Sequence, residues 1–212
     1  YYILIGMIGI IDYNAGNITS VERALKALNI EYILSKNPEE LKDCSKLIFP
    51  GDGDAAYAMK ELDKSGFTTF IKNWIKDGKP ILGICLGSQI IFDWSEEGDT
   101  NCLGFVKGKI QHFYTIDSSL KNKLKVPHMG WNNLERSNGE CPILKDVPLN
   151  ADFYFVHSYV ICPDDGTVVK ASADYGIKVP AVIQSGNIFA CQFHPEKSGV
   201  PGLKILENFC ND

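Results

Sequence analysis

Short apolar runs alternate with amphipathic stretches through the first half of the chain, and this alternation limits the fold more than any other feature of the sequence. The apolar runs are IGIIDY, EYILS, KLIFPG and PILGIC; a helix is expected over residues 17–28, a short one after EYILS and two longer ones before PILGIC. Strands rich in Ile, Leu and Val between amphipathic helices are typical of βαβ units around a parallel sheet. The pattern predicts an α/β fold that binds ligands at the carboxyl ends of its strands.

The second half of the chain has a different pattern. Strands are expected in GFVKGKIQHFY, DFYFVHSYVIC, TVVKASADYG and PAVIQSGNIFACQFH, separated by turn residues, so an antiparallel region is added to the mostly parallel sheet. The spacing of Leu203, Ile205, Leu206 and Phe209 predicts a closing helix. No linker or repeat divides the 212 residues, and a single domain over residues 1–212 is expected.

Composition and charge exclude several classes of function. The formal net charge is −5 and no run of Lys and Arg is present, so nucleic acid is not an expected partner. The apolar residues 1–11 are too short to cross a bilayer and lack the features of a signal peptide, so they are expected to form an opening buried strand without membrane association. Met7 could be the natural start, with residues 1–6 an extension.

Seven cysteines are scattered without C-x-x-C spacing. Neither a complete disulfide framework nor a zinc site is indicated, and no metal or other cofactor is expected. The composition therefore favours a reducing, cytoplasmic location.

Cys85 has an unusual setting. It ends the apolar run PILGIC, glycines stand at positions 83 and 87, and a helical pattern follows at once. A G-x-C-x-G sequence between strand and helix is the thiol version of a nucleophile elbow, in which small neighbours tolerate a strained turn. The helix N-terminus would favour a thiolate and leave the Leu86 amide available to an oxyanion. The alternative is that Cys85 is a small buried hydrophobe, the usual role of a free cysteine.

The remaining cysteines lack flanking glycines and are interpreted as structural. They are Cys44, Cys102, Cys141, Cys162, Cys191 and Cys210.

A thiolate nucleophile needs an imidazole, and the imidazole needs an acceptor that selects its tautomer. His194 stands at the end of an apolar strand with Glu196 two residues further on; side chains two apart on an extended chain point to the same side. A surface turn with an unrelated His and Glu is the alternative. His128 in PHMGWN and His157 in FVHSY are rivals because both segments look like loop ends, whereas His112 is expected to be structural.

Six motifs together resemble a known family. They are DYNAGN at 12–17, FPGDG at 49–53, GICLGSQ at 83–89, PHMGWN at 127–132, YFVHSY at 154–159 and FHPEKSG at 193–199. The G-x-C-x-G motif with a later HPE is similar to the class I, or triad, glutamine amidotransferases. The narrower set DYNAGN, PHMGWN and HPEKSG resembles the subfamily of glutaminase subunits of imidazole glycerol phosphate synthase.

The resemblance implies a reaction and a set of residues. Cys85 would attack the carboxamide of L-glutamine, His194 would act as base and then acid, and Glu196 would orient His194. The oxyanion hole would come from Leu86 and from the loop that contains Asp52 and Gly53. The expected substrate contacts are Gln89, Glu97, Ser158 and Tyr159, although Glu97 could equally be a solvated surface acid.

Asp52 departs from the pattern of the family, in which this position is usually Val. A carboxylate beside an oxyanion would be unfavourable, so the Asp52 side chain is predicted to face away from the site.

The resemblance also implies a protein partner. In the family the glutaminase docks on a (β/α)8 cyclase subunit, which uses the ammonia to make imidazole glycerol phosphate and an aminoimidazole carboxamide ribotide in histidine biosynthesis. The expected interface residues of this heterodimer are Asn14, Asn17, Met129, Trp131 and Lys197; Trp131 could instead be a core aromatic.

Three alternatives stay open at the level of sequence. The chain could feed ammonia to a cyclase-like partner that amidates surface sugars. It could be a free-standing cysteine hydrolase or peptidase, or a catalytically silent binding partner that keeps the fold. The narrow motifs and the complete triad favour the glutaminase.

Overall fold

An eight-stranded sheet forms the centre of the described part of the protein. The computed structural model describes residues 6–137 and 139–211. The strand order is β2-β1-β3-β4-β14-β13-β12-β9, parallel from β2 to β14 and antiparallel from β14 to β9. The strands are β1 Ile8–Ile11, β2 Tyr32–Ser35, β3 Lys46–Gly51, β4 Ile81–Cys85, β9 Glu135–Arg136, β12 Val169–Asp174, β13 Lys178–Ser185 and β14 Ile188–Cys191. The predicted α/β class with a mostly parallel sheet is confirmed.

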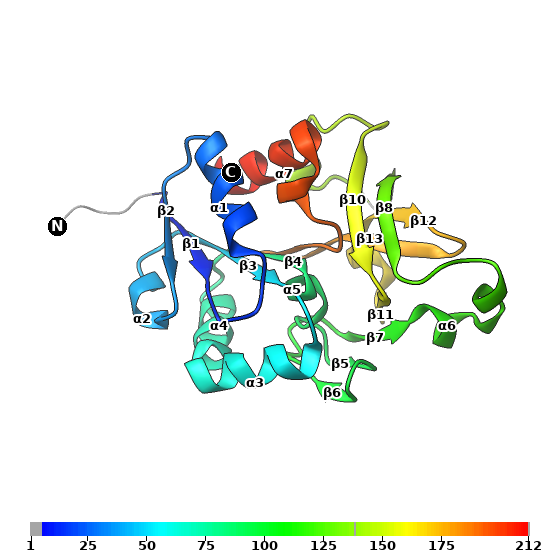
Figure 1. Ribbon diagram of the computed structural model, residues 1–212. Helices are drawn as coiled ribbons and strands as arrows, with labels where there is room; N and C mark the ends of the chain where they lie inside the picture. The colour runs from blue at the N-terminus through cyan, green and yellow to red at the C-terminus, as the bar shows by residue number, and fades with distance from the viewer. Residues whose placement is uncertain (1–5, 138, 212) are drawn as a thin grey trace.

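Helices cover both faces of the parallel half, as Figure 1 shows. Helices α1 and α7 lie on one face, and α3 and α4 lie on the other. The long helices are α1 Ile18–Ala27, α3 Ala55–Ser65, α4 Phe67–Lys76 and α7 Gly199–Asn211, and the short α2 spans Pro38–Leu41. The first strand begins at Ile8, and the part of its prediction that falls on residues 1–5 lies outside the described residues.

The alternation of side chains along each strand divides the core into two layers. Ile48 on β3 packs with Val21 and Leu25 of α1, whereas its neighbours Leu47 and Phe49 pack with α3 and α4. All five residues are fully buried. Because successive strand residues point to opposite faces, a continuous apolar run such as KLIFPG satisfies both layers, as expected of a strand covered on both sides.

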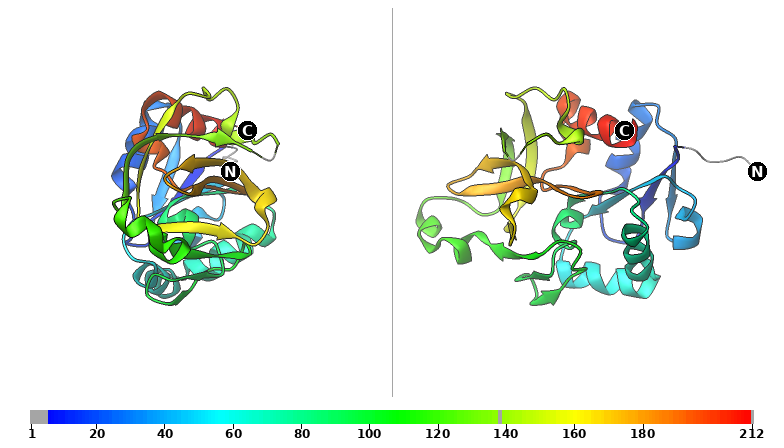
Figure 2. Two further views of the ribbon diagram at one scale, coloured as in Figure 1. Left: turned by 90° about the vertical axis from the view of Figure 1, so that its right-hand side faces the viewer. Right: turned by 180° about the vertical axis from the view of Figure 1, so that it is seen from behind.

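The second half of the chain builds two smaller sheets, ordered β10-β8 and β11-β7-β5-β6. Figures 1 and 2 show this region on the side of the molecule opposite the N-terminus. Its strands are β5 Trp94–Ser95, β6 Thr100–Asn101, β7 Gly108–His112, β8 His128–Asn133, β10 Asp152–His157 and β11 Tyr159–Pro163. Its short helices and 3-10 turns are α6 Phe113–Ile116, η1 Ser118–Asn122, η2 Pro142–Leu144 and η3 Gly166–Val168.

Two local predictions are wrong. PHMGWN looks like a loop end, but His128–Asn133 forms β8, which pairs with β10 along its whole length and places His128 opposite His157. The helix after Cys85 is a single turn, α5 Leu86–Gln89, so a helix dipole contributes less there than expected. In addition, β14 comes late in the chain yet pairs in parallel with β4. This pairing joins the parallel and the antiparallel parts of the sheet.

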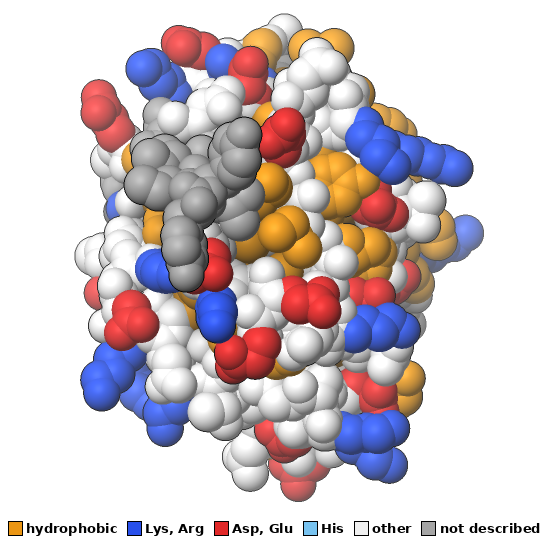
Figure 3. Space-filling view, turned by 90° about the vertical axis from the view of Figure 1, so that its left-hand side faces the viewer, with side chains coloured by type: hydrophobic (Ala, Val, Ile, Leu, Met, Phe, Trp, Pro, Cys, Tyr) orange, Lys and Arg blue, Asp and Glu red, His pale blue; other side chains and the backbone are white. Residues whose placement is uncertain are grey.

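None of the described helices has the length and apolarity needed to span a membrane. Figure 3 shows basic and acidic side chains interspersed around a group of apolar ones on the face that lies at the left of Figure 1. On that face the Lys and Arg side chains do not form a continuous stripe, in keeping with the net charge of −5.

Candidate active site

Cys85 stands on a strained turn at the carboxyl end of β4. Its backbone angles, φ 53° and ψ −112°, lie in a region that side chains other than Gly rarely adopt. The Ser88 hydroxyl donates to the Cys85 carbonyl at 2.5 Å and closes the turn from within. The central strand β4 holds the strained residue in place, because it is buried and paired with β3 and β14.

The glycines around Cys85 are required by close backbone packing. A Cβ on Gly87 would overlap the carbonyl oxygen of Phe49, and one on Gly51 would overlap the Gly87 amide. A Cβ on Gly83 would lie 2.7 Å from the Gly87 carbonyl oxygen. The turn is therefore pressed against the end of β3, which places the loop after β3 beside the sulfur.

His194 and Glu196 form a buried pair after β14, the strand next to β4. His194 Nδ1 lies 2.7 Å from Glu196 Oε1, and the two side chains are 3% and 1% exposed. The contact was predicted from extended geometry, but residues Pro195–Lys197 form a 3-10 turn, η4, that swings Glu196 back to the ring. The Ser198 hydroxyl donates to the His194 carbonyl at 2.6 Å and accepts from the Tyr154 amide, which ties this turn to β10.

The Cys85 sulfur is the second group that acts on His194. Burial by itself would lower the pKa of the imidazole, but its interactions with the Cys85 sulfur and the Glu196 carboxylate outweigh burial and raise the pKa of His194 to about 10. Among the described residues His194 Nε2 has no partner with normal hydrogen-bond geometry, so it is available to a reacting group. A His194 imidazolium beside Cys85 can supply a proton to a group that reacts at the sulfur.

A cavity of about 240 Å³ opens directly over Cys85. It is lined by Asp52, Gly53, Cys85, Leu86, Gln89, Glu97, Pro127, Val156, His157, Ser158 and Tyr159. Every predicted oxyanion and substrate residue is in this set. A cavity of this volume suits a small molecule rather than a polymer.

The comparisons with known proteins agree with this geometry. The chain matches the family Glutamine amidotransferase class-I over residues 9–212. It belongs to this family.

Relatives of known name cover nearly the whole chain. It is 47% identical over 206 residues to the imidazole glycerol phosphate synthase subunit HisH of Geobacillus sp. (strain WCH70), covering 97% of this chain and 96% of that protein. It is 45% identical over 204 residues to the subunit of the same name from Bacillus subtilis (strain 168), covering 96% and 95%.

Solved structures show the same fold at low sequence identity. A crystal structure of a glutamine amidotransferase matches with a TM-score of 0.73 at 20% identity, over 95% of this chain and 98% of that one. PurLQS from Thermotoga maritima matches with a TM-score of 0.72 at 20% identity, over 97% of both chains.

Gln89 and Glu97 are two of the polar side chains in this pocket that have defined partners. Gln89 Nε2 donates to the Tyr159 carbonyl at 3.1 Å and to Gln192 Oε1 at 2.8 Å. Glu97 Oε2 accepts from the Ala55 amide at the start of α3, at 3.0 Å. Burial raises the pKa of Glu97, in part offset by that hydrogen bond. Glu97 is thus a member of the pocket rather than a solvated surface acid.

The loop after β3 carries an unexpected contact. Asp52 Oδ1 accepts a hydrogen bond from the Gly53 amide at 2.9 Å. The Asp52 carboxylate thus binds one of the two amides that were expected to face the oxyanion. The exposed Asp52 and the positive φ of Gly53 permit this tight turn.

The rival histidines do not lie in a position to serve as the base. His157 lines the pocket, but both of its ring nitrogens have partners. Burial lowers the pKa of His128 to about 4 and that of His157 to about 3. His112 Nδ1 accepts from the Tyr114 amide and caps α6.

The five residues expected at a partner surface occupy three places. Met129 and Trp131 project outward from β8 and are 60% and 59% exposed, so Trp131 is not a core aromatic. Asn14, at φ 65°, bonds Glu61 and Lys36, while Asn17 caps α1 by accepting from the Ser20 amide. Lys197 directly follows Glu196 on η4.

Sequence reasoning missed several supporting residues. Val156 and Pro127 line the pocket, and Val156 O lies 4.0 Å from the sulfur. Gln192 and Ser198 hold Gln89 and His194 in place. The position of Ser198 within the HPEKSG motif could have pointed to it. For Gln192 the only indication in the sequence was its position two residues before His194.

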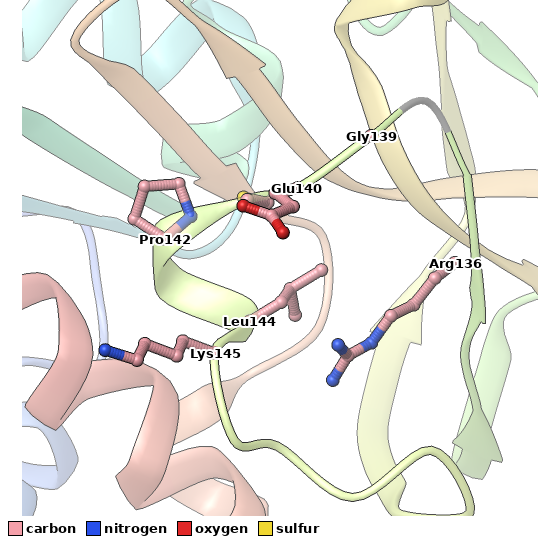
Figure 4. A pocket seen from close by; sticks show the side chains of 7 residues that line it. Arg136, Gly139, Glu140, Pro142, Leu144 and Lys145 are labelled. Carbon is pink, nitrogen blue, oxygen red and sulfur yellow. The ribbon is translucent and has the colours of Figure 1, made fainter.

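A second cavity lies away from this site. It has a volume of about 540 Å³, and its lining shares no residue with the Cys85 pocket. Figure 4 shows Arg136, Leu144 and Lys145 around it, between β9 and η2. The Arg136 guanidinium donates to the Val147 carbonyl, so it is already used within the fold.

Proposed function

We propose that this chain is the glutaminase subunit of imidazole glycerol phosphate synthase, which hydrolyses L-glutamine and delivers the ammonia to a cyclase subunit. The observation that carries the proposal is the buried His194–Glu196 pair, whose free Nε2 lies on the side of Cys85. The 45–47% identity to subunits named HisH supports the choice of pathway.

The first half of the reaction forms a thioester. The Cys85 thiolate attacks the carboxamide carbon of glutamine, and the oxygen becomes an oxyanion that the Leu86 amide faces from α5. The His194 imidazolium then gives the proton on Nε2 to the leaving nitrogen, and ammonia departs. Glu196 holds the Nδ1 proton throughout and stabilises the imidazolium.

The second half restores the enzyme. Neutral His194 removes a proton from water, the resulting hydroxide attacks the thioester carbonyl, and glutamate leaves as the Cys85 thiolate reforms. Gln89 and Glu97 would hold the amino-acid end of glutamine. Because both hydrogens of Gln89 Nε2 are donated within the protein, the amide has only its oxygen left, which suits the ammonium group of the substrate.

The partner would dock over β8 and η4. Met129 and Trp131 form an exposed apolar pair on β8, and Trp131 packs edge-on against Tyr154 of β10. Large exposed aromatic and Met side chains are typical of protein interfaces. Lys197 would add a charge directly beside the triad.

The proposal is tested by a glutaminase assay of the purified chain with and without the cyclase subunit and its ribotide substrate. Stimulated glutamate release and imidazole glycerol phosphate formation are expected. Cys85→Ala should abolish both, whereas Cys210→Ala, at the end of α7, should retain them. Activity of Cys85→Ala, or stimulation only by a sugar-amidating partner, would contradict the proposal.

The docking surface is tested by Trp131→Ala and Lys197→Ala. Both variants should keep the basal rate and lose stimulation by the cyclase. Leu149→Ala is the matched control, because Leu149 is exposed but lies outside the proposed surface. An unchanged stimulated rate in both variants would exclude this surface.

A further inference from the structure

Two buried histidines face each other across β8 and β10. His128 and His157 are register partners, 2% and 6% exposed. The His128 ring is stacked between Tyr175 and Phe155, with centroids 4.0 and 4.5 Å away and interplanar angles of 18° and 17°. Stacking on both faces holds the ring plane, so only its two nitrogens can make directional contacts.

A chain of hydrogen bonds runs through these rings. Asn132 Nδ2 lies 3.4 Å from His128 Nε2, and the same amide donates to the Asp174 carbonyl at 2.8 Å. His128 Nδ1 lies 3.1 Å from His157 Nε2, and His157 Nδ1 lies 2.7 Å from the Tyr159 carbonyl oxygen. The chain thus leads from β8 to the wall of the Cys85 pocket.

Chemistry determines the position of each proton. A carbonyl oxygen only accepts, so His157 Nδ1 must carry hydrogen. Burial keeps both imidazoles neutral at physiological pH by lowering their pKa values. His157 Nε2 is then an acceptor, His128 Nδ1 must donate to it, and His128 Nε2 accepts from Asn132. Both rings are therefore Nδ1–H tautomers.

The chain ends on the carbonyl that also holds Gln89. Tyr159 O accepts from His157 Nδ1 and from Gln89 Nε2, so both of its lone pairs are used. Gln89 in turn bonds Gln192 Oε1. Loss of the His157 bond would free the peptide between Tyr159 and Val160 and, with it, the orientation of the Gln89 amide.

We propose that His128 and His157 are positioning residues that orient the Tyr159 carbonyl and Gln89, and thereby set the affinity of the pocket for glutamine. The choice of ligand rests on the proposed function, whereas the tautomers do not. Neither ring exchanges protons with the substrate. The inward side chains of β8 would in this way organise the pocket, while its outward side chains, Met129 and Trp131, are left for the partner.

The first test is spectroscopic and needs no activity. Long-range ¹H–¹⁵N correlation of the imidazoles in the full chain should show His128 and His157 as neutral Nδ1–H tautomers at pH 7. His112 serves as an internal reference, and His128→Phe and His157→Phe assign the signals. An Nε2–H tautomer, or a protonated ring, at either position would overturn the proposal.

The second test uses three replacements of His157 that differ in which nitrogen they imitate. Asn places an amide nitrogen near the position of Nδ1, Gln places its amide near Nε2, and Phe keeps only the ring. His157→Gln and His157→Phe should raise the KM for glutamine about tenfold or more with a smaller change in kcat, because uniform binding is lost. His157→Asn should stay within roughly threefold of the parent, because it can still donate to Tyr159 O.

The results separate this proposal from a structural role and from the proposed function. An equal rise in the KM for glutamine in His157→Asn and His157→Gln would overturn the positioning role. A fall in kcat at constant KM would overturn it too. Should His157→Phe fail to fold, the Asn and Gln pair still decides. Absence of any cyclase-stimulated glutaminase activity in the parent chain would defeat the proposed function. The tautomers seen by NMR would then be the only test of the hydrogen-bond chain.

Discussion

His194 Nδ1 lies 2.7 Å from Glu196 Oε1, and the pair is almost completely enclosed by the turn η4 and by β10. A carboxylate buried at this distance selects one tautomer of the ring and directs Nε2 toward Cys85. The position of the Nε2 proton in any reaction at the sulfur therefore depends on Glu196.

Glu196→Gln should remove the charge while keeping the size of the side chain. We expect kcat of the stimulated glutaminase to fall roughly 10²–10⁴-fold with little change in KM, because the amide supports neither the imidazolium nor a single tautomer. Glu207→Gln on α7, whose carboxylate bonds Lys204, is the control and should be near the parent. A loss of less than about threefold would contradict the role of Glu196.

Selective alkylation should identify the thiolate. Burial raises the pKa of each of the other six thiols, to about 12 for Cys102 and Cys210. We expect limiting iodoacetamide at pH 7 to modify Cys85 first, as measured by peptide mass spectrometry. In His194→Gln the preference should disappear. Preferential modification of another cysteine in the native chain would show that no thiolate forms beside His194.

The neutral histidine pair should make the fold sensitive to acid. Folding lowers the pKa of His128 from 6.5 to about 4 and that of His157 from 6.5 to about 3. The unfolded chain then binds more protons, so the stabilisation is complete above about pH 6.5 and is lost as the pH falls through these values. Urea unfolding should show a loss of roughly 2–3 kcal/mol per ring between pH 7 and pH 4. The loss should be smaller in His128→Phe.

Gly87→Ala should damage the elbow itself. The added methyl group would overlap the Phe49 carbonyl at the end of β3. We expect a loss of about 1–3 kcal/mol in the free energy of unfolding, together with loss of Cys85 reactivity. Gly166→Ala, where the methyl group meets no atom within 4 Å, is the control. Equal stability of both variants would show that the turn at Gly87 can move away from the end of β3 without loss of free energy.

Asp52 should restrain the basal rate. Its carboxylate occupies the Gly53 amide and adds negative charge beside the developing oxyanion. Asp52→Val removes both effects, whereas Asp52→Asn can still accept from Gly53 and removes only the charge. We expect the rate without the partner to rise several-fold in Asp52→Val and less in Asp52→Asn, since one oxyanion donor is worth about 10²–10³ in kcat. Unchanged rates in both variants would show that Asp52 has no influence on the hole.

Much of the fold and of the candidate site could be predicted from local patterns in the sequence. The parallel half, its helices and the elbow follow from apolar periodicity and from glycines at fixed spacing, which act over a few residues. The pairing of His194 with Glu196 was predicted for the wrong reason, because a 3-10 turn rather than an extended segment joins them. The strand character of PHMGWN was missed, because its alternation of exposed and inward residues has meaning only when β10 is beside it.

The sequence by itself determined the class of fold, the nucleophile candidate and its base, since each depends on neighbours in the chain. Only the tertiary structure decided what surrounds them. The parallel pairing of β14 with β4 brings His194 to Cys85 across more than a hundred residues. The Asp52 carboxylate on the Gly53 amide and the chain from His128 to Gln89 likewise depend on hydrogen-bond geometry and burial, which arise only when distant strands pack together.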